Sequence, residues 1–190
     1  MRVIAGAQKG RLLKGPSSRG LRPTPNRVRE ALFSIIGARI EGARVADFFA
    51  GTGAVGIEAL SRGAGHVAFV DSDPRAVKLL RANVTHCGVA ARAAVYGVPV
   101  ATFLRRHGPA AGPYDIVFAD PPYRSDAGVA FLSSLTTGVT LALGSLIILE
   151  HDSKATVPAE IGGLHLVRDY RYGDTTLSLF AFGAERLSAQ

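Results

Sequence analysis

The chain has 190 residues, 47% of them hydrophobic, which suits one compact domain with a full core. Cys87 is the only cysteine and the five histidines lack close metal spacing, so we expect neither a disulfide nor a bound metal. No apolar run is long enough to span a bilayer, and no charged start leads into an apolar stretch, which argues against a membrane partner and a secretion signal. We therefore expect a monomeric cytoplasmic protein.

The positive charge is concentrated at the N-terminus. Residues 1–30 contain eight Lys or Arg and one acid, Glu30, so this segment accounts for the whole net charge of +7. A basic arm on a neutral body is typical of a protein that binds nucleic-acid phosphates, although a solvated tail is the alternative. Val3-Ile4 and Leu12-Leu13 flank a glycine-containing turn, which favours a short hairpin.

We accordingly expect residues 1–20 to form a basic hairpin and loop, and residues 21–190 to form the main domain. The candidate phosphate-binding residues are Arg2, Lys9, Arg11, Lys14, Arg19, Arg22 and Arg27. A helix from about Thr24 to Gly37 is expected next, with Thr24 as its cap and Pro25 in its first turn.

Strand patterns alternate with helical patterns through the main domain. Strands are expected at Arg44–Phe49, His66–Asp71, Ala91–Tyr96, Tyr114–Asp120, Ser145–Glu150, Leu164–Tyr170 and Thr175–Phe182. Helices of about ten residues between the first five strands require parallel crossovers, with helices on both faces of the sheet. The turn at residues 171–174 makes the final strand antiparallel. The expected fold class is α/β, with a seven-stranded, mostly parallel sheet.

The first strand leads into a glycine-rich turn, Gly51-Thr52-Gly53-Ala54-Val55-Gly56, which a helical pattern follows. Glycines let the backbone approach a ligand where a Cβ would clash, and the start of a helix offers free N–H groups. The second strand ends in Asp71, roughly twenty residues further on, where an acid can accept both hydroxyls of a ribose. The pattern predicts a cofactor that contains a ribose.

The same glycines satisfy the dinucleotide fingerprint, so a nicotinamide enzyme and a S-adenosylmethionine (SAM) enzyme are both open. Asp47 lies four residues before the first glycine, where a carboxylate would repel a pyrophosphate and could face a cationic amino-acid moiety. Alternatively, Asp47 caps the nearby helix start. SAM is favoured, because the motif described next has no role in hydride transfer.

That second motif, Asp120-Pro121-Pro122-Tyr123, follows the fourth expected strand. Adjacent prolines fix two φ angles and remove two N–H donors, so nearby carbonyl oxygens can accept from a ligand. Asp120 adds an acceptor-only side chain, and Tyr123 offers a face for stacking. This corner can hold a flat amine-bearing base, although a plain strand exit stays open. Because ligands collect at the carboxyl ends of strands, we expect Gly51, Asp71 and Asp120 at one edge.

These residues resemble a known family. Residues 47–53 resemble motif I of class I SAM-dependent methyltransferases, and residues 120–123 resemble the [Asp/Asn]-Pro-Pro-[Tyr/Phe] motif of their amino-methylating branch. The run from Leu21 to Phe33, with the residues before it, is similar to the opening of the bacterial RsmD-like family of 16S rRNA guanine-N2 methyltransferases. The resemblance extends to Tyr172-Gly173-Asp174-Thr175, and Asn26 departs from the Asp that is usual in that family.

The resemblance implies a Rossmann-like fold, SAM as the cofactor, and 16S rRNA, naked or in an assembling 30S subunit, as the partner of the basic arm. It also implies methyl transfer to the N2 amine of a guanine that is flipped out of its stack. The implied cofactor residues are Asp47, Phe49, Ala50, Gly51, Thr52, Gly53, Asp71 and Ser72. The implied catalytic residues are Asp120, Pro121 and Tyr123, which would orient the amine and stack the base.

Other functions remain open. A SAM enzyme with this corner could methylate the N6 amine of an adenine or a protein glutamine, and a catalytically inactive RNA-binding module is a third reading. Asp rather than Asn at position 120 favours guanine. Guanine presents two adjacent donors, N1–H and the N2 amine, whereas adenine pairs a donor with an acceptor.

Overall fold

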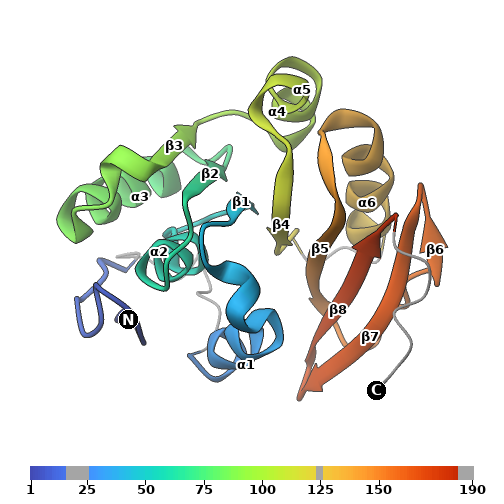
Figure 1. Ribbon diagram of the computed structural model, residues 1–190, viewed down its shortest axis with the longest axis horizontal. Helices are drawn as coiled ribbons and strands as arrows, with labels where there is room; N and C mark the ends of the chain where they lie inside the picture. The colour runs from blue at the N-terminus through green and yellow to red at the C-terminus, as the bar shows by residue number, and fades with distance from the viewer. Residues whose placement is uncertain (16–25, 123–125, 184–190) are drawn as a thin grey trace. The chain divides into compact units, whose positions relative to one another are not determined.

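The computed structural model describes residues 1–15, 26–122 and 126–183. They belong to two compact units, Met1–Val100 and Ala101–Gln190, which are described in turn (Figure 1). The expected helix cap Thr24 lies outside the described residues, as do the candidates Arg19, Arg22 and Tyr123. Within the described ranges, no helix is long and apolar enough to cross a membrane.

The first unit contains a parallel arrangement of strands in the order β3-β2-β1, joined by helices. Its elements are α1 (Asn26–Ile36), η1 (Gly37–Ile40), β1 (Arg44–Phe48), α2 (Ala54–Ser61), β2 (His66–Val70), α3 (Pro74–Cys87), η2 (Ala90–Arg92) and β3 (Ala93–Tyr96). Asp73 caps α3 by accepting from the Arg75 N–H at 2.8 Å, and Pro74 occupies the first turn. Parallel strands with helical crossovers confirm the expected fold class.

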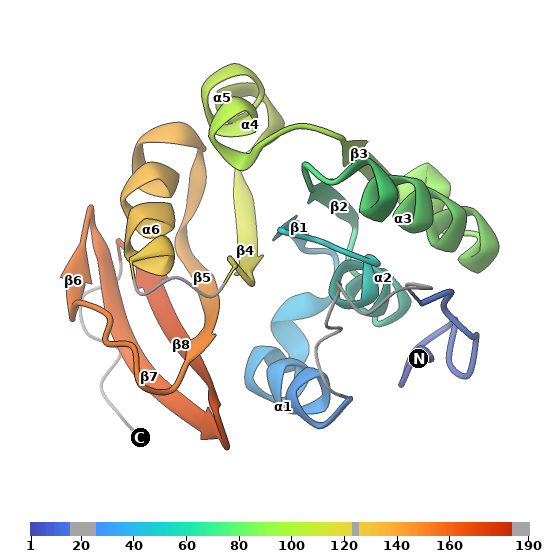
Figure 2. The same cartoon turned by 180° about the vertical axis from the view of Figure 1, so that it is seen from behind.

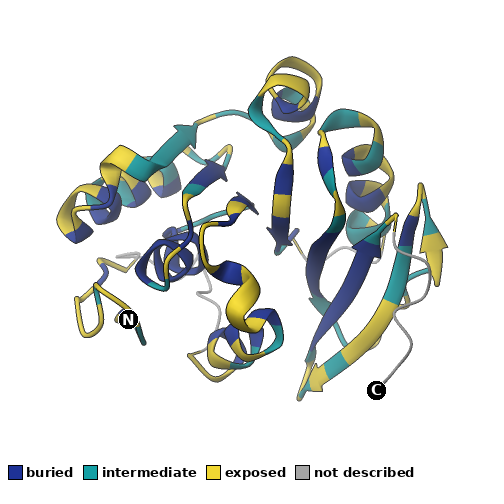
Figure 3. Cartoon of the chain, in the orientation of Figure 1, coloured by how far each residue is buried: buried dark blue, intermediate teal, exposed yellow. Residues whose placement is uncertain are grey.

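Close packing between α2 and the strands depends on Gly56. Every residue of α2 is buried, and β1 is buried from its second residue onward (Figure 3). A Cβ on Gly56 would lie 2.3 Å from Phe69 Cε1 and 2.8 Å from Val67 Cγ1, both on β2. The third glycine of the motif therefore allows the helix to lie close to the sheet, which holds the turn before it at the strand ends.

The N-terminal segment forms the expected short hairpin. Arg2 and Leu12 form an antiparallel bridge, and the Val3 N–H donates to the Arg11 carbonyl at 3.0 Å. Val3 and Leu13 are buried, and the hairpin lies beside α2 in both views (Figures 1 and 2). The hairpin is therefore packed into the first unit and does not project from it as a tail.

A buried carboxylate on α2, that of Glu58, holds the hairpin in place. It accepts from the backbone N–H groups of Ile4 at 2.7 Å and Ala5 at 2.9 Å. Its Oε1 also accepts from the Arg62 Nε at 2.8 Å. Glu58 has no exposed surface, so these donors replace the water that a carboxylate would otherwise need. Near the end of the same helix, the Ser61 hydroxyl donates to the Ala5 carbonyl.

Helix α1 carries a buried arginine that also contacts the hairpin. The Arg29 Nη2 donates to the Arg2 carbonyl at 2.6 Å and to Asn26 Oδ1 at 3.1 Å. Burial lowers the pKa of the Arg29 guanidinium, and the Glu58 carboxylate opposes that shift. Arg29 belongs to the basic N-terminal segment by sequence, but its complete burial removes it from any surface that binds phosphate.

The second unit is built on the parallel pair of β4 and β5. Its elements are α4 (Val100–Arg106), α5 (Gly108–Ala111), β4 (Tyr114–Ala119), α6 (Ala127–Gly138), β5 (Leu141–Asp152), β6 (Glu160–Ile161), β7 (Leu164–Tyr172) and β8 (Thr175–Phe182). Helix α6 joins β4 to β5, whereas β8 pairs antiparallel with both β5 and β7. The antiparallel final strand confirms the prediction.

Several details of the strands differ from the prediction. β7 runs to Tyr172 instead of Tyr170, because Arg171 and Tyr172 still pair with β8, so the turn lies at Gly173-Asp174 instead of residues 171–174. β1, β2 and β4 each end one residue earlier than expected. β5 runs from Leu141 to Asp152 instead of Ser145 to Glu150, because Tyr114 already pairs with Leu141 before a register shift and β8 continues the pairing to Asp152. β3 begins two residues later than expected, because a 3-10 turn occupies Ala90–Arg92. The two-residue strand β6, which pairs with β7, was not predicted.

We expect Glu58→Ala to lower the free energy of unfolding by about 3 kcal/mol, because it leaves two hairpin N–H groups without their acceptor in a packed interface. Chemical denaturation followed by circular dichroism measures this change. Glu41→Ala, which removes an exposed acid from the same unit, is the matched control and should change stability by less than about 0.5 kcal/mol. Equal losses in the two variants would contradict the anchoring role of Glu58.

Candidate active site

The turn after β1 contains several residues in the left-handed region of the backbone map. Phe49, Gly51 and Gly53 have φ values of 61°, 55° and 77°. Glycine adopts this conformation without strain, whereas a bulky side chain stores about 1–3 kcal/mol. The Ala50 N–H donates to the Val70 carbonyl at 3.1 Å, which fixes the loop to the end of β2. A non-glycine residue held in this way is typical of a functional site.

Two acids fix the two ends of this glycine loop. Asp47 Oδ2 accepts from the Gly56 N–H at 2.9 Å, so this carboxylate caps α2, the alternative role that the sequence left open. Asp71 Oδ2 accepts from the Gly51 N–H at 2.7 Å, and its Oδ1 accepts from the Asp73 N–H at 2.9 Å. Gly51 and Asp71 are thus brought together as expected. Asp47 is only 1% exposed whereas Asp71 is half-buried, so Asp71 is the acid that a ligand can reach.

A third side chain, absent from the sequence-based candidates, comes from α3. Asn83 Nδ2 donates to the Thr52 carbonyl at 3.0 Å and to the Lys14 carbonyl at 3.1 Å. Its Oδ1 accepts from the Lys14 N–H at 2.8 Å. One fully buried amide therefore joins the end of the hairpin to the glycine loop. A signal was present in the sequence, because Asn83 shares the apolar helix face of Leu80 and Val84, where a polar group needs a partner.

The remaining cofactor candidates differ in how accessible they are. Thr52 and Gly53 are buried, whereas Ala50 and Gly51 are partly exposed and Ser72 is exposed. A Cβ built on Gly51 would meet only the Phe49 carbonyl, 4.0 Å away, so the backbone at Gly51 faces open space. A ligand can therefore approach the loop at Ala50 and Gly51.

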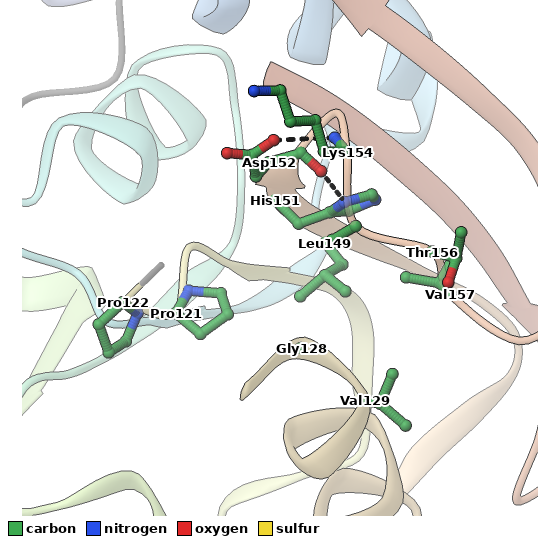
Figure 4. A pocket seen from close by; sticks show the side chains of 11 residues that line it. Pro121, Pro122, Gly128, Val129, Leu149, His151, Asp152, Lys154, Thr156 and Val157 are labelled. Atoms are coloured by element: carbon green, nitrogen blue, oxygen red, sulfur yellow. Dashed lines mark hydrogen bonds between the residues drawn. The ribbon is translucent and has the colours of Figure 1, made fainter. Parts of the chain in front are cut away.

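The proline corner follows β4 in the second unit. Asp120 comes directly after the last residue of the strand and is partly exposed, while Pro121 is buried and Pro122 is exposed. The carboxyl end of a parallel strand is a common position for a ligand-binding residue. A pocket lies beside the two prolines, between the start of α6 and the end of β5 (Figure 4). The other candidate in this motif, Tyr123, is outside the described residues.

The candidate RNA-binding residues in the described ranges are all exposed. They are Arg2, Lys9, Arg11 and Lys14 on the hairpin and Arg27 on α1. Arg11 also has a structural contact, because its Nη1 donates to the His86 carbonyl near the end of α3 at 2.7 Å. The hairpin thus presents its cations from a position that is fixed relative to α2 and α3.

The one cysteine is unsuited to nucleophilic chemistry. Cys87 is buried at the end of α3, and burial raises the pKa of its thiol against a smaller opposing effect of the Arg11 charge. A protonated, buried thiol is a poor nucleophile.

As for metals, the residues that the structure describes contain no group of three His, Cys, Asp or Glu that could hold an ion.

Known proteins resemble the chain over nearly its full length. The family described as "Conserved hypothetical protein 95" matches residues 1–181. The chain is 34% identical over 180 residues to "Ribosomal RNA small subunit methyltransferase D" of Escherichia coli strain K12, covering 95% of this chain and 89% of that protein. It is 35% identical over 180 residues to "Putative rRNA methyltransferase YlbH" of Bacillus subtilis strain 168, covering 95% and 98%.

A solved structure, "Putative methyltransferase yhhF from Escherichia coli", aligns with a TM-score of 0.85 at 34% identity, over 97% of this chain and 99% of that one. The expected Rossmann-like methyltransferase fold is therefore confirmed. By its matched length and its motifs, the chain belongs to the Conserved hypothetical protein 95 family, the RsmD-like methyltransferases.

Proposed function

We propose that the protein transfers a methyl group from SAM to the exocyclic N2 amine of a guanine in the 16S rRNA of the small ribosomal subunit. The observation that carries the proposal is the glycine loop, where the Gly51 N–H lies 2.7 Å from the Asp71 carboxylate. That arrangement suits the ribose of a nucleoside cofactor. Relatives named as rRNA methyltransferases, matched over 95% of the chain, support the substrate class.

The first unit would hold the cofactor. SAM supplies an electrophilic methyl group on a sulfonium centre. Asp71 would accept from the ribose hydroxyls, while the backbone of Ala50 and Gly51 allows close approach. Two backbone N–H groups already orient the Asp71 carboxylate, so it needs no rearrangement to bind. Asp47 is buried and caps α2, so it acts by shaping the loop.

The second unit would orient the target amine. The lone pair of an exocyclic amine is delocalised into its ring, so the amine reacts only when it is held in one orientation. Asp120 and the Pro121 carbonyl are proposed to accept its two hydrogens and direct the lone pair at the methyl group. A carboxylate can also accept from the neighbouring N1–H of guanine, which favours guanine over adenine. Asp120 can then take up the proton that the methylated amine loses.

The exposed cations of the hairpin would bind the RNA backbone, because phosphate contacts supply most of the affinity for nucleic acid. The target base must leave its stack, and Tyr123 is proposed to stack on it once it is extruded. Such an enzyme works on rRNA in the cytoplasm, and we propose that it does so as a monomer.

Nucleoside mass spectrometry of small-subunit RNA tests the proposed function. RNA from a strain that lacks the gene should lack one N2-methylguanosine, and the purified protein with SAM should restore it. A restored N6-methyladenosine, or a methylated glutamine in a ribosomal protein, would instead support the alternative amino-methylation. Binding of a nicotinamide nucleotide without binding of SAM would contradict the cofactor assignment.

We expect Asp120→Ala to lower the single-turnover rate of methylation by about 10²-fold, because a preorganised acceptor for the amine is lost. SAM affinity should hardly change, since the proposed cofactor residues all lie in the first unit. Asp126→Ala removes an exposed acid just beyond the corner and serves as the control. If folded Asp120→Ala methylates RNA at the wild-type rate, the proline corner is a structural strand exit without a catalytic role.

The hairpin cations can be tested without deleting the hairpin, whose removal would expose the buried Glu58 carboxylate. We expect Lys9→Gln to weaken RNA binding and to reduce the slope of log affinity against log salt by about 0.7, the value for one single-strand phosphate contact. Arg105→Gln, an exposed substitution on α4, is the charge-matched control. RNA titrations at several salt concentrations measure the slope for each protein. If Lys9→Gln and wild type have identical slopes, Lys9 does not contact an RNA phosphate.

Asn83→Ala should weaken SAM binding by about 1–3 kcal/mol, because the Thr52 carbonyl of the glycine loop loses its donor. Arg11→Ala, which removes a hairpin bond to the same helix but no bond to the loop, should leave SAM affinity unchanged. Calorimetry without RNA compares the two variants. Unaltered SAM affinity in Asn83→Ala, with only a loss of stability, would show that the amide supports the fold alone.

A further inference from the structure

We infer that the pocket beside Pro121 and Pro122 binds a nucleobase of the RNA substrate that neighbours the methylated guanine. The inference rests on the proposed function and concerns a part of the substrate that the proline corner does not itself hold. The pocket lies within the second unit, at the carboxyl ends of the parallel strands β4 and β5 (Figure 4). Ligands of such sheets bind at this end.

The size and walls of the pocket suit a flat base. Its volume is about 250 Å³, below the range of about 300–1,000 Å³ that is usual for sites of whole small molecules. A nucleobase is the part of RNA that such a volume can enclose, with its sugar and phosphate left outside. Pro121, Val129, Leu149 and Val157 provide apolar walls.

The ring of His151 is a fixed flat surface at the end of β5. Its Nδ1 donates to the Asp152 carbonyl at 2.8 Å, since a carbonyl oxygen can only accept. Its Nε2 lies 2.7 Å from Ser178 Oγ, and the Ser178 hydroxyl donates to Asp169 Oδ1 at 2.6 Å. Because both ring nitrogens lie against protein groups, we infer that the ring offers the pocket its face, on which a base can stack.

Asp152 supplies an acceptor in the same pocket. Its Oδ1 accepts from the Lys154 N–H at 2.8 Å. Its Oδ2 has no hydrogen-bond partner within the described part of the chain, and the residue is partly exposed. An acceptor-only group selects a base edge that presents an N–H, such as the amine of cytosine, adenine or guanine.

Two exposed cations belong to the same unit as the pocket and are proposed to contact a phosphate attached to the bound base. Lys154 lines the pocket and is exposed. Arg171 is exposed on β7 and lies opposite Thr176, which is itself opposite His151. Directly opposed residues of antiparallel strands share a face of the sheet, so Arg171 and His151 are on the same face. The carboxylates of Asp152 and Asp169 offset these two charges, so Lys154 and Arg171 offer single phosphate contacts and no excess of positive charge.

The position of Asp120 indicates that the bound base is a neighbour of the target and not the target itself. Under the proposed function, the target amine must meet the Asp120 carboxylate. Asp120 does not line the pocket, which begins with the residue after it. A base seated against Pro121 and His151 therefore occupies a separate site, where it reads the sequence next to the methylated guanine.

The test combines protein variants with abasic RNA. The RNAs are a small-subunit rRNA fragment that the wild-type protein methylates, and two versions that lack the base on the 5′ or the 3′ side of the target. The proteins are wild type, Asp152→Asn, His151→Ala, His151→Phe and the control Asp174→Asn, an exposed acid in the turn between β7 and β8. RNA affinity and the single-turnover rate at saturating RNA are measured, with SAM affinity as a check of folding.

We expect Asp152→Asn and His151→Ala to weaken binding of the intact RNA on the order of tenfold, with the saturated rate unchanged. His151→Phe keeps the stacking face and should bind nearly as well as wild type. One abasic RNA should bind wild type on the order of tenfold more weakly, and Asp152→Asn should then cause no further loss, because the lost contact is the same one. Asp174→Asn should behave as wild type.

Three results would overturn the inference alone, and a fourth would overturn it together with the proposed function. If losses from Asp152→Asn and from both abasic RNAs multiply, the pocket holds neither neighbour. If Asp152→Asn lowers the saturated rate and leaves affinity intact, the target base occupies the pocket. If Asp152→Asn binds and reacts as wild type does, the pocket holds no base, while the proposed function stands. A wild-type protein that methylates no small-subunit RNA would overturn the proposed function and this inference together.

Discussion

A backbone loop that must approach a ligand cannot be covered by side chains of its own, so polar groups from elsewhere have to hold it. In the first unit, the glycine loop is the segment that needs such support. Asp47 holds its helical end, Asp71 holds Gly51 and Asn83 holds Thr52. Each of these contacts is a hydrogen bond to the loop backbone, so the loop is defined before any ligand arrives. The strained conformation of Phe49 persists because the surrounding bonds fix it.

The same reasoning explains why the hairpin is part of the fold. Glu58 on α2 and Asn83 on α3 both bind backbone N–H groups of the N-terminal segment. Buried acceptors of this kind need hydrogen-bond donors, and the N-terminal segment supplies these donors only when it lies in one position against α2 and α3. The cations of the hairpin are therefore displayed from a fixed base. Since Asn83 also holds the glycine loop, the position of Lys14 and that of Thr52 depend on one amide.

The sequence predicted the elements whose signals are local. Glycine spacing, strand patterns and the Asp73-Pro74 cap each depend on neighbouring residues, and the structure has them close to the predicted bounds. The role of Asp47 stayed ambiguous, because an acid that caps a helix and an acid that faces a ligand can occupy the same position in the sequence. Arg29 could be counted as a surface cation because composition says nothing about burial. His151 contacts Ser178, and Ser178 in turn donates to Asp169, so the chain of contacts joins three strands that only strand register brings together.

Separate groups for reaction and recognition have a chemical advantage in an enzyme of this kind. Under the proposed function, the methylated amine would be the same in every guanine of the RNA, so Asp120, the group proposed to orient it, could not tell one guanine from another. Discrimination must come from contacts to other nucleotides, and such contacts act on binding rather than on the rate of the bound complex. In the inferred pocket, the Asp152 carboxylate would only accept, so a base edge without an N–H would leave its second oxygen unpaired. On this inference, loss of that single contact would weaken binding of the wrong RNA without slowing the reaction of the right one.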